Sequence, residues 1–213
     1  MRFRIFVSLV VLLLTASLYA QTNEIGVFVN HSSFSSSSET DPTIPLTGTV
    51  KIDSKAGYGI SFNHYFSSNF AIQFSGQTIR GKARLGTSVA GVNLPEADAT
   101  LDMKQYDAAL RWYVIPSGSF RPYVGAGIAW IGSGKLKSDV VQSGTGAKSI
   151  GLENKTTWLA AGGIDFSVSP QVTITLAGKY THYTAELDTT PDDLFHNLKF
   201  NPLTIAAGIG YRF

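Results

Sequence analysis

The chain has 213 residues, no cysteine, and 17 basic against 15 acidic residues. Without cysteine it has neither disulfides nor thiolate metal sites, and the nearly balanced charge gives no indication of a nucleic-acid partner. After residue 20, no apolar run approaches the roughly 18 residues that a membrane-spanning helix needs, so a helical membrane protein is excluded.

The N-terminal segment has the order of residues found in secretory signal peptides. Arg2 and Arg4 precede an apolar run over residues 5–14, and small and polar residues follow. The run is short for a membrane-spanning helix, although an N-terminal anchor helix is the alternative. We expect residues 1–20 to be cleaved on export and residues 21–213 to form one domain.

Eight later segments alternate apolar residues with small or polar ones at every second position. This period predicts β-strands with two different faces, and glycine, proline, serine and asparagine mark the joins between them. The expected strands lie near residues 23–31, 56–66, 70–80, 100–115, 122–132, 155–168, 172–184 and 201–213.

Short and long connections alternate strictly between these strands. The short ones are residues 67–69, 116–121 and 169–171, and the long ones lie near residues 32–55, 81–99, 133–154 and 185–200. The sequence therefore predicts an all-β fold, an eight-stranded antiparallel up-and-down transmembrane β-barrel with four long outer loops and three short periplasmic turns.

Aromatic residues on the apolar face gather at the strand ends. Those near the long connections are Tyr58, Tyr106, Trp130, Trp158 and Tyr180, and those near the short turns are Phe66, Phe70, Phe166, Tyr211 and the C-terminal Phe213. Two aromatic belts around an aliphatic band match the two interfaces of a bilayer. The alternative is a soluble barrel with its apolar face inward around a ligand, but the opposite face is too small and too polar for a soluble exterior. We expect Phe213 to close the last strand and to be recognised by the barrel-assembly machinery.

The inward face carries charges in a lumen that eight strands leave narrow. The expected lumen charge network consists of Asp107, Arg111, Asp165, Lys179 and Arg212. An ion-pair plug is one interpretation and a constriction that sorts solutes is the other. Small inward residues also predict an apolar hollow beneath the long loops; they are Gly125, Gly127, Ala161 and Gly163.

Basic residues gather in the long-loop half of the chain, for example at Lys51, Lys55, Arg80, Lys82 and Arg84. They could hold the phosphates of lipopolysaccharide, or form an ordinary solvated loop surface.

Signals for catalysis are weak. The four histidines lack metal-ligand spacing, and we expect neither a metal nor a cofactor. Some outer-membrane barrels are lipid-modifying enzymes with an outward histidine and serine; His182 and Thr184 face lipid by parity, with Glu186 beyond them. Threonine is a poor nucleophile without further activation, so we expect a belt histidine and no enzyme.

Three segments carry a resemblance to a known family. The stretches "RPYVGAGIAW", "TTWLAAGGIDFSV" and "FNPLTIAAGIGYRF" resemble the fifth, sixth and eighth strands of the OmpW family of small outer-membrane barrels. Leu203 stands where that family often has an aromatic residue, and "NEIGVFVNH" lacks the family's arginine, so generic OmpA/OmpX-like barrels are a neighbouring class. The resemblance implies a narrow passage in the cell outer membrane for small hydrophobic molecules, with lateral exit into the membrane. The alternative is a structural or surface-interaction barrel with a plugged polar interior.

Overall fold

The computed structural model describes most of the chain after its N-terminal segment. The described residues are 22–35, 37–40, 46–89, 92–93, 97–138, 150–152, 154–185, 198–199 and 201–213. The expected signal peptide lies outside them. Among the described residues, no helix has the length and apolarity needed to cross a membrane.

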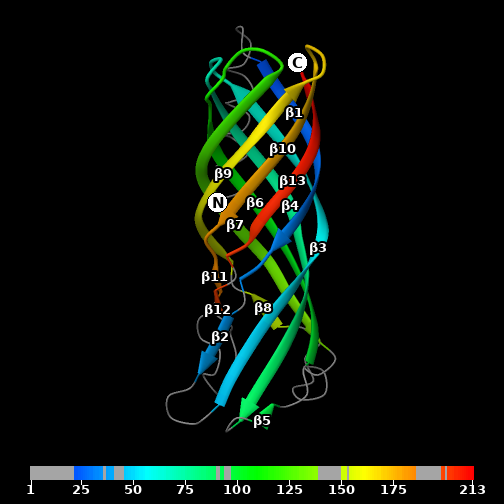
Figure 1. Cartoon of the computed structure of the whole chain (residues 1–213), viewed down its shortest axis with the longest axis vertical. Helices are drawn as coiled ribbons and strands as arrows, with labels where there is room; N and C mark the ends of the chain where they lie inside the picture. Colours follow the sequence, from blue (N-terminus) through cyan, green and yellow to red (C-terminus); the bar gives the residue numbers. More distant parts are fainter. Residues whose placement is uncertain are drawn as a thin grey trace, which may run out of the picture.

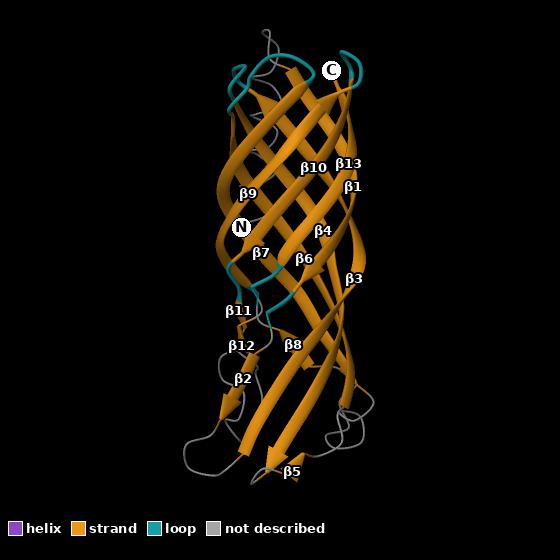
Figure 2. Cartoon of the chain, in the orientation of Figure 1, coloured by secondary structure: helices purple, strands orange, loops and turns teal. Residues whose placement is uncertain are grey.

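Eight long antiparallel strands form a closed barrel, as the alternation predicts (Figures 1 and 2). They are β1 (Thr22–Ser33), β3 (Leu46–Tyr65), β4 (Phe70–Val89), β6 (Ala97–Tyr113), β7 (Phe120–Ser138), β9 (Lys155–Ser167), β10 (Val172–Thr181) and β13 (Leu203–Arg212). Three short strands pair with long ones in the same sheet: β2 (Ser37–Thr40) with β3, β5 (Val92–Asn93) with β4, and β8 (Ile150–Leu152) with β7. Two more, β11 (Thr184–Ala185) and β12 (Leu198–Lys199), pair with each other in a separate sheet.

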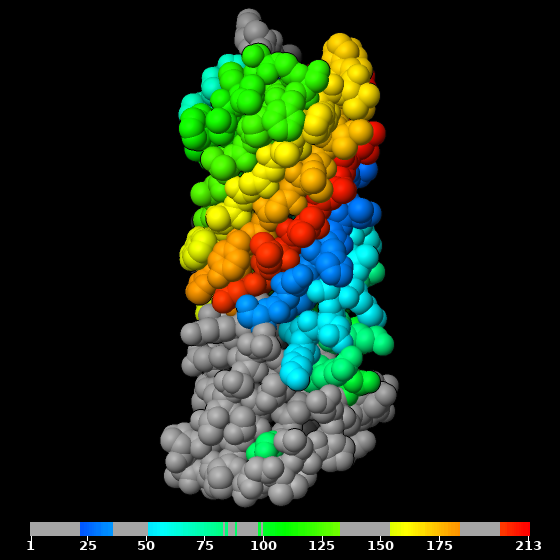
Figure 3. Space-filling view, in the orientation of Figure 1, coloured from blue at the N-terminus to red at the C-terminus, as the bar shows by residue number. Residues whose placement is uncertain are grey.

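Pairing of the first strand with the last closes the barrel. β1 pairs with β13 from Glu24 opposite Arg212 to Ser33 opposite Leu203, and its other edge pairs with β3. The space-filling view shows β13 in red running alongside β1 in blue (Figure 3). Closure leaves no long strand with a free edge along the paired section, which is the condition for a sheet to cross a bilayer.

The exterior of the barrel is apolar and the interior is polar, the reverse of a soluble barrel. Along β1, Ile25, Val27 and Val29 are exposed, whereas Glu24 and Asn30, which flank this stretch, are buried. The same alternation continues around the wall, so the outward face offers a continuous apolar surface to lipid.

The structure places the predicted belt aromatics on the outward face, in two groups of neighbouring rings. In one belt Tyr106 lies 5.4 Å from Trp130, and Trp158 lies 5.6 Å from Tyr180, measured between ring centroids. In the other belt, Phe66 stacks on Phe70, and Tyr211 and Phe213 are exposed nearby. Phe166 packs edge-on against Phe120. Phe120 was not among the residues predicted for this belt.

Three segments predicted as long loops contain strand, so those predictions were wrong over much of residues 32–55, 81–99 and 133–154. β3 begins at Leu46, β4 continues to Val89 and β7 continues to Ser138. The prediction failed because the outward residues change from apolar to charged in this region. Lys51, Asp53 and Lys55 are exposed while the residues between them are half-buried. Pairing continues there without the apolar alternation that signals a lipid-facing strand.

The long strands make one side of the barrel taller than the other. β3 has no partner on β1 beyond Ala56, and β7 has none on β9 beyond Ile131, yet both continue alongside β4 and β6. Figure 1 shows these four strands extending past the other long strands, β1, β9, β10 and β13, at the bottom of the view. We call this end the extended end, and the opposite end, which carries the short turns, the turn end.

The C-terminal residue takes part in closing the barrel. The backbone N–H of Phe213 donates to the carbonyl of Asn23 at 2.8 Å, and the N–H of Asn23 donates back at 2.8 Å. Deleting Phe213 removes both hydrogen bonds, each contributing about 1 kcal/mol, together with an exposed ring of the turn-end belt. We expect the deletion to lower the fraction of heat-modifiable barrel on cold SDS gels while leaving export across the inner membrane unchanged.

A Phe213→Leu variant is the matched control for this deletion, because it keeps the backbone pairing and an apolar side chain. Reduced assembly of both variants would indicate that the ring itself is recognised. Normal assembly of the deletion would contradict a role for Phe213.

Candidate functional site

The lumen near the turn end is filled by tyrosines around one buried carboxylate. Asp165 has no exposed surface, and its two oxygens accept hydrogen bonds from Tyr113 Oη at 2.7 Å and Thr175 Oγ1 at 2.8 Å. The ring of Tyr113 packs at a tilt against those of Tyr65 and Tyr123, with ring centroids 5.8 and 5.5 Å apart. These side chains come from five different strands, so only barrel closure brings them together.

Two arginines share this carboxylate. Arg111 Nη1 lies 3.8 Å and Arg121 Nη2 lies 3.9 Å from Asp165 Oδ2. The Arg111 guanidinium also sits 4.2 Å over the centroid of the Tyr123 ring, and that of Arg121 sits 4.6 Å over Tyr113. Cation–π contacts of this kind strengthen when water is excluded, as it is around these buried rings.

A second carboxylate lies beside the first group and was missed in the sequence interpretation. Glu24 Oε1 accepts a hydrogen bond from Asn63 Nδ2 at 2.8 Å, and Glu24 Oε2 accepts one from Arg212 Nη2 at 3.1 Å. The Tyr65 hydroxyl donates to Glu24 Oε2 at 3.3 Å and thereby links the two carboxylates. The turn-end plug is defined by these side chains: Glu24, Asn63, Tyr65, Arg111, Tyr113, Arg121, Tyr123, Asp165 and Arg212.

Farther from the turns, a separate ion pair crosses the lumen. Lys179 Nζ lies 2.7 Å from Asp107 Oδ2 and donates to Ser75 Oγ at 3.1 Å, and Ser75 donates in turn to Asp107 Oδ1 at 2.7 Å. Gln105 joins the group through a 3.3 Å hydrogen bond to Asp107. The five predicted lumen charges thus all face inward, but they divide between this pair and the plug.

Toward the extended end, five inward side chains from β4, β6, β7 and β9 are apolar. Each of these five exposes 1% of its surface or less. We call this set the apolar collar: Ile79, Leu101, Met103, Ile131 and Leu159. On these four strands the lumen lining therefore changes from charged and hydrogen-bonded at the turn end to aliphatic toward the extended end, while the facing strands keep the buried polar residues Ser32, Thr181 and Thr204.

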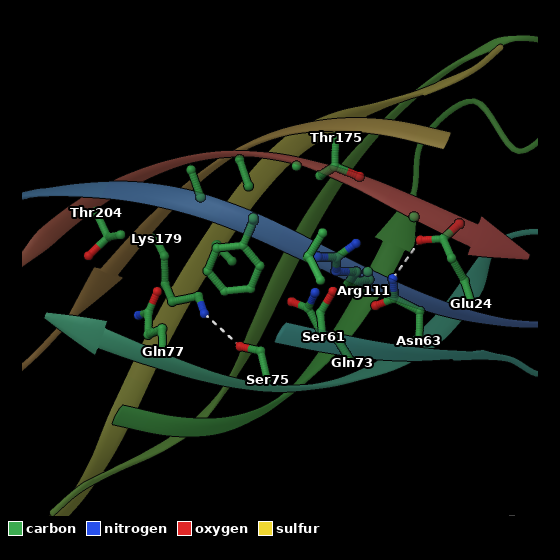
Figure 4. Close-up of a pocket in the computed structure, with 18 of the residues that line it drawn as sticks. Glu24, Ser61, Asn63, Gln73, Ser75, Gln77, Arg111, Thr175, Lys179 and Thr204 are labelled. Atoms are coloured by element: carbon green, nitrogen blue, oxygen red, sulfur yellow. Dashed lines mark hydrogen bonds between the residues drawn. The ribbon is translucent and has the colours of Figure 1, made fainter. Parts of the chain in front are cut away.

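A small cavity lies between the plug and the Lys179 ion pair (Figure 4). Its volume is about 50 Å³, room for about four water molecules. In Figure 4, Lys179 and Gln77 lie at one end of the cavity, and Glu24 and Asn63 lie at the other, close to Arg111. On the turn side of the plug lies a second recess of about 280 Å³, whose lining includes Arg121 and Arg212. Because the plug is thin, Arg111 borders the cavity on one side of it, whereas Arg121 and Arg212 border the recess on the other side.

The cavity does not lie where the small residues predicted a hollow. A Cβ atom at Gly163 would come within 2.7 Å of the Tyr123 hydroxyl, and one at Gly125 or Gly127 would meet the backbone of β6 at 2.7 Å or less. Neighbouring groups thus fill the space that these residues appear to leave. Of the four predicted residues, only Ala161 lines the cavity. Strands β1, β10 and β13 provide further small lining residues, namely Gly26, Ala177, Gly178, Ala206, Gly208 and Gly210.

Arg121 was predicted to lie in a short turn, but it is the second residue of β7 and points into the lumen. The stretch "PSGSFR" is rich in turn residues, which concealed that the strand begins at Phe120. Parity along β7 identifies its role, because Arg121 has the same inward parity as Tyr123 and Gly125.

His182 belongs to the aromatic surface near the extended end. Its ring stacks on Trp158 at 5.5 Å with nearly parallel planes, and its backbone carbonyl accepts a hydrogen bond from Thr157. Thr184 lies in β11, and Glu186 lies outside the described residues. This position is that of a belt residue, which often has an apolar body and a polar tip.

An antiparallel barrel with an apolar exterior, two aromatic belts and a polar lumen defines a transmembrane β-barrel of the outer-membrane type. The chain matches the family model of the outer membrane protein beta-barrel domain over residues 6–213, and it belongs to that family.

Relatives and solved structures agree with this assignment. An outer membrane protein of Rickettsia bellii is 27% identical over 187 residues, covering 81% of this chain and 71% of that protein. The crystal structure of the outer membrane protein OprG from Pseudomonas aeruginosa superposes with a TM-score of 0.68 at 15% identity, covering 91% of this chain and 96% of OprG. The outer membrane protein AlkL, solved in lipid bilayers, gives a TM-score of 0.58 at 16% identity, covering 92% of each chain. At these identities the structural likeness shows the fold, that of a small outer-membrane barrel.

Because Asp165 lies at the centre of the plug, replacing it tests whether the plug stabilises the barrel. Replacing Asp165 with Asn leaves Arg111 and Arg121 buried without their shared counter-charge, and breaking a buried pair in this way costs about 3–5 kcal/mol. We expect the free energy of unfolding to fall by that amount, measured by urea unfolding in lipid vesicles followed by tryptophan fluorescence.

Asp53→Asn is the matched control, since Asp53 forms an exposed ion pair with Arg84 at 2.8 Å. An exposed pair contributes less than about 1 kcal/mol. Equal losses for the two variants would show that the plug does not stabilise the barrel.

Proposed function

We propose that this protein is a narrow outer-membrane passage that takes up small hydrophobic molecules at its extended end and releases them sideways into the membrane. The observation that supports this most directly is the change of lumen lining from the charged plug to the apolar collar. Aliphatic side chains at the entrance favour an apolar solute over water or ions.

The plug argues against a straight path through the barrel. An apolar molecule passing it would have to break the contacts of Asp165 and Glu24 and leave buried charges unpaired, which is costly. A solute that enters from the extended end therefore leaves more easily through the wall than through the floor.

Between β9 and β10 the wall lacks side chains on its outward face at one point. Gly162 and Gly178 lie opposite each other on the outward face, and a Cβ atom at either would meet no atom closer than 3.6 Å. Gly178 also lines the lumen cavity, so only backbone separates the cavity from lipid at this point. Sideways release needs local separation of strands here, and no bulky side chain stands in its way.

The full burial of the collar favours a second candidate, a structural or surface-interaction barrel that transports nothing. In that case Leu101 and Met103 are permanent filling, whereas in a passage they move aside for a solute. Methionine is suited to such movement because its side chain is flexible and polarizable. The two functions differ in whether the chemistry of the collar affects uptake.

The orientation belongs to the same proposal. After export by a cleaved signal peptide, the barrel-assembly machinery would insert the chain with its turn end in the periplasm and its extended end outside. Outside, the charged face of the extension would meet lipopolysaccharide. Lys51 lies opposite Arg84, and Lys55 lies opposite Arg80. Like charges directly opposite each other destabilise a sheet. Phosphates bound between these side chains would relieve that repulsion.

The first experiment separates the floor from the entrance. Arg111 borders the cavity while Arg121 and Arg212 border the recess below, so Arg111→Ala should join the two spaces. We expect ion conductance in planar bilayers to rise severalfold, while uptake of a small hydrophobic compound by vesicles changes little. Uptake that rises together with conductance would mean that the path runs straight through.

The complementary variant is Met103→Gln, which keeps the size of the collar side chain but makes it polar. We expect it to lower hydrophobic uptake, because an unpaired amide at an apolar entrance costs roughly 1–3 kcal/mol, which lowers the rate between about fivefold and about 150-fold. Met103→Leu is the apolar control and should retain uptake. If the unmodified protein, Met103→Gln and Met103→Leu all give the same low uptake as empty vesicles, the structural barrel is the better description.

The second experiment tests lipopolysaccharide. Each lysine near an anionic membrane surface contributes about 1 kcal/mol, so Lys51→Gln, Lys55→Gln and Lys82→Gln together should weaken binding of purified lipopolysaccharide by about two orders of magnitude. Dephosphorylated lipopolysaccharide should bind the unmodified protein and the triple variant equally weakly. Unchanged affinity of the triple variant for the phosphorylated form would assign these lysines to an ordinary solvated surface.

A further inference from the structure

We propose that the lumen cavity is a binding site for one small inorganic anion of the chloride class, held beside Arg111. This site does not depend on the proposed transport function, since it concerns the charge balance of the plug. It follows from a count of charges, from unpartnered donors and from the size of the cavity.

The turn-end plug and the Lys179–Asp107 pair together carry one more positive than negative charge. The four cations are Arg111, Arg121, Lys179 and Arg212, and the three anions are Glu24, Asp107 and Asp165. Two close pairs account for two charges of each sign, Lys179 with Asp107 at 2.7 Å and Arg212 with Glu24 at 3.1 Å. Two arginines then remain for the single carboxylate of Asp165.

That carboxylate cannot satisfy both arginines. Its oxygens already accept hydrogen bonds from Tyr113 and Thr175, and the two guanidinium groups stay 3.8 and 3.9 Å away, beyond hydrogen-bond distance. A buried cation without its own counter-charge is expensive in a lumen that excludes most water. An anion taken from solution would supply the missing charge.

The unpartnered donors lie at the cavity. Arg111 exposes only 3% of its surface, and among the described residues its Nε and Nη1 atoms have no hydrogen-bond partner. Gln77 Nε2 and Tyr123 Oη also lack partners, and both residues line the same cavity. Water could accept these hydrogen bonds, but only an anion both accepts them and neutralises the extra charge of Arg111.

The volume limits the class of ligand. A cavity of about 50 Å³ holds a chloride, bromide or nitrate ion with one or two waters, but not an organic acid of metabolite size. Glu24 also borders the cavity, but its charge is balanced by Arg212, and both its oxygens accept hydrogen bonds. Lys179 stands at the far end of the cavity, where Asp107 at 2.7 Å balances its charge, so Arg111 is the lining cation without a close carboxylate (Figure 4).

The site predicts a barrel whose stability depends on the identity of the anion. We would measure the thermal unfolding midpoint of the purified full chain in detergent with sodium chloride, bromide or gluconate at equal ionic strength. Gluconate is too large to enter. We expect a midpoint about 2–4 °C higher in chloride and bromide than in gluconate, the shift that a modest gain in stability produces in a domain of this size.

Two variants locate the effect. Arg111→Gln keeps a donor but removes the charge and should abolish the difference between anions. Arg84→Gln, on the exposed face, should keep it in full. A midpoint that is the same in all three salts, or an anion effect that survives Arg111→Gln, would overturn the proposal.

A crystallographic measurement covers the case in which Arg111→Gln does not fold. Crystals of the unmodified chain grown in bromide should show an anomalous peak in the cavity within hydrogen-bond distance of Arg111. A cavity that contains only water under these conditions would also overturn the proposal.

Discussion

Every feature of this barrel depends on the hydrogen bonds between β1 and β13. In a bilayer no water is available for backbone N–H and C=O groups, so a sheet crosses only when its first and last strands pair. The register from Glu24 opposite Arg212 to Ser33 opposite Leu203 meets this requirement. The same register brings the carboxylate of Glu24 to the guanidinium of Arg212, although 188 positions separate the two residues in the chain. Closure and the turn-end plug are therefore consequences of one pairing.

Closing eight strands also fixes how little space the interior has. An eight-stranded barrel is just wide enough for its own side chains, so a charge on the inward face contacts whatever faces it from across the lumen. Asp165 on β9 accepts a hydrogen bond from Tyr113 on β6, and Lys179 on β10 reaches Asp107 on β6. Since few of these groups can reach bulk water, the lumen contains pairs and networks where a wider barrel would contain a pore.

The sequence predicts the features that depend on the alternation of residues along a strand. It does not predict the features that depend on contacts between side chains of different strands. The eight strands, their antiparallel order and the inward position of Arg111 and Asp165 follow from a period of two and from the turn residues. The extensions of β3 and β4 were missed because their outward residues, such as Lys51 and Arg84, are charged. Outward residues are apolar only where a strand faces lipid, so the alternation that identifies a strand stops where the strand leaves the membrane. Both strands still pair there, because cross-strand hydrogen bonds do not require apolar side chains.

The position of the cavity was not predictable from residue size alone. Gly163 appeared to leave space, but the ring of Tyr123 lies against it, and the ring of Phe28 lies against Gly59 in the same way. Which glycine stands next to an empty space depends on the direction of large side chains from neighbouring strands. Glu24 escaped notice for a related reason, because its partners Asn63 and Arg212 are far away along the chain.

The choice of arginine over lysine in the plug explains how so thin a layer can close the barrel. A guanidinium group is planar and can stack on an aromatic ring while its edge offers hydrogen bonds. Arg111 stacks on Tyr123 and Arg121 on Tyr113, and both approach Asp165 with their edges. Lys179, by contrast, meets Asp107 with the single ammonium group at the end of its side chain. The turn end is thus closed by guanidinium groups held against aromatic rings, whereas the aliphatic side chains of the collar toward the extended end are not tied by hydrogen bonds. Rearrangement is therefore easier at the extended end, where a solute would have to enter.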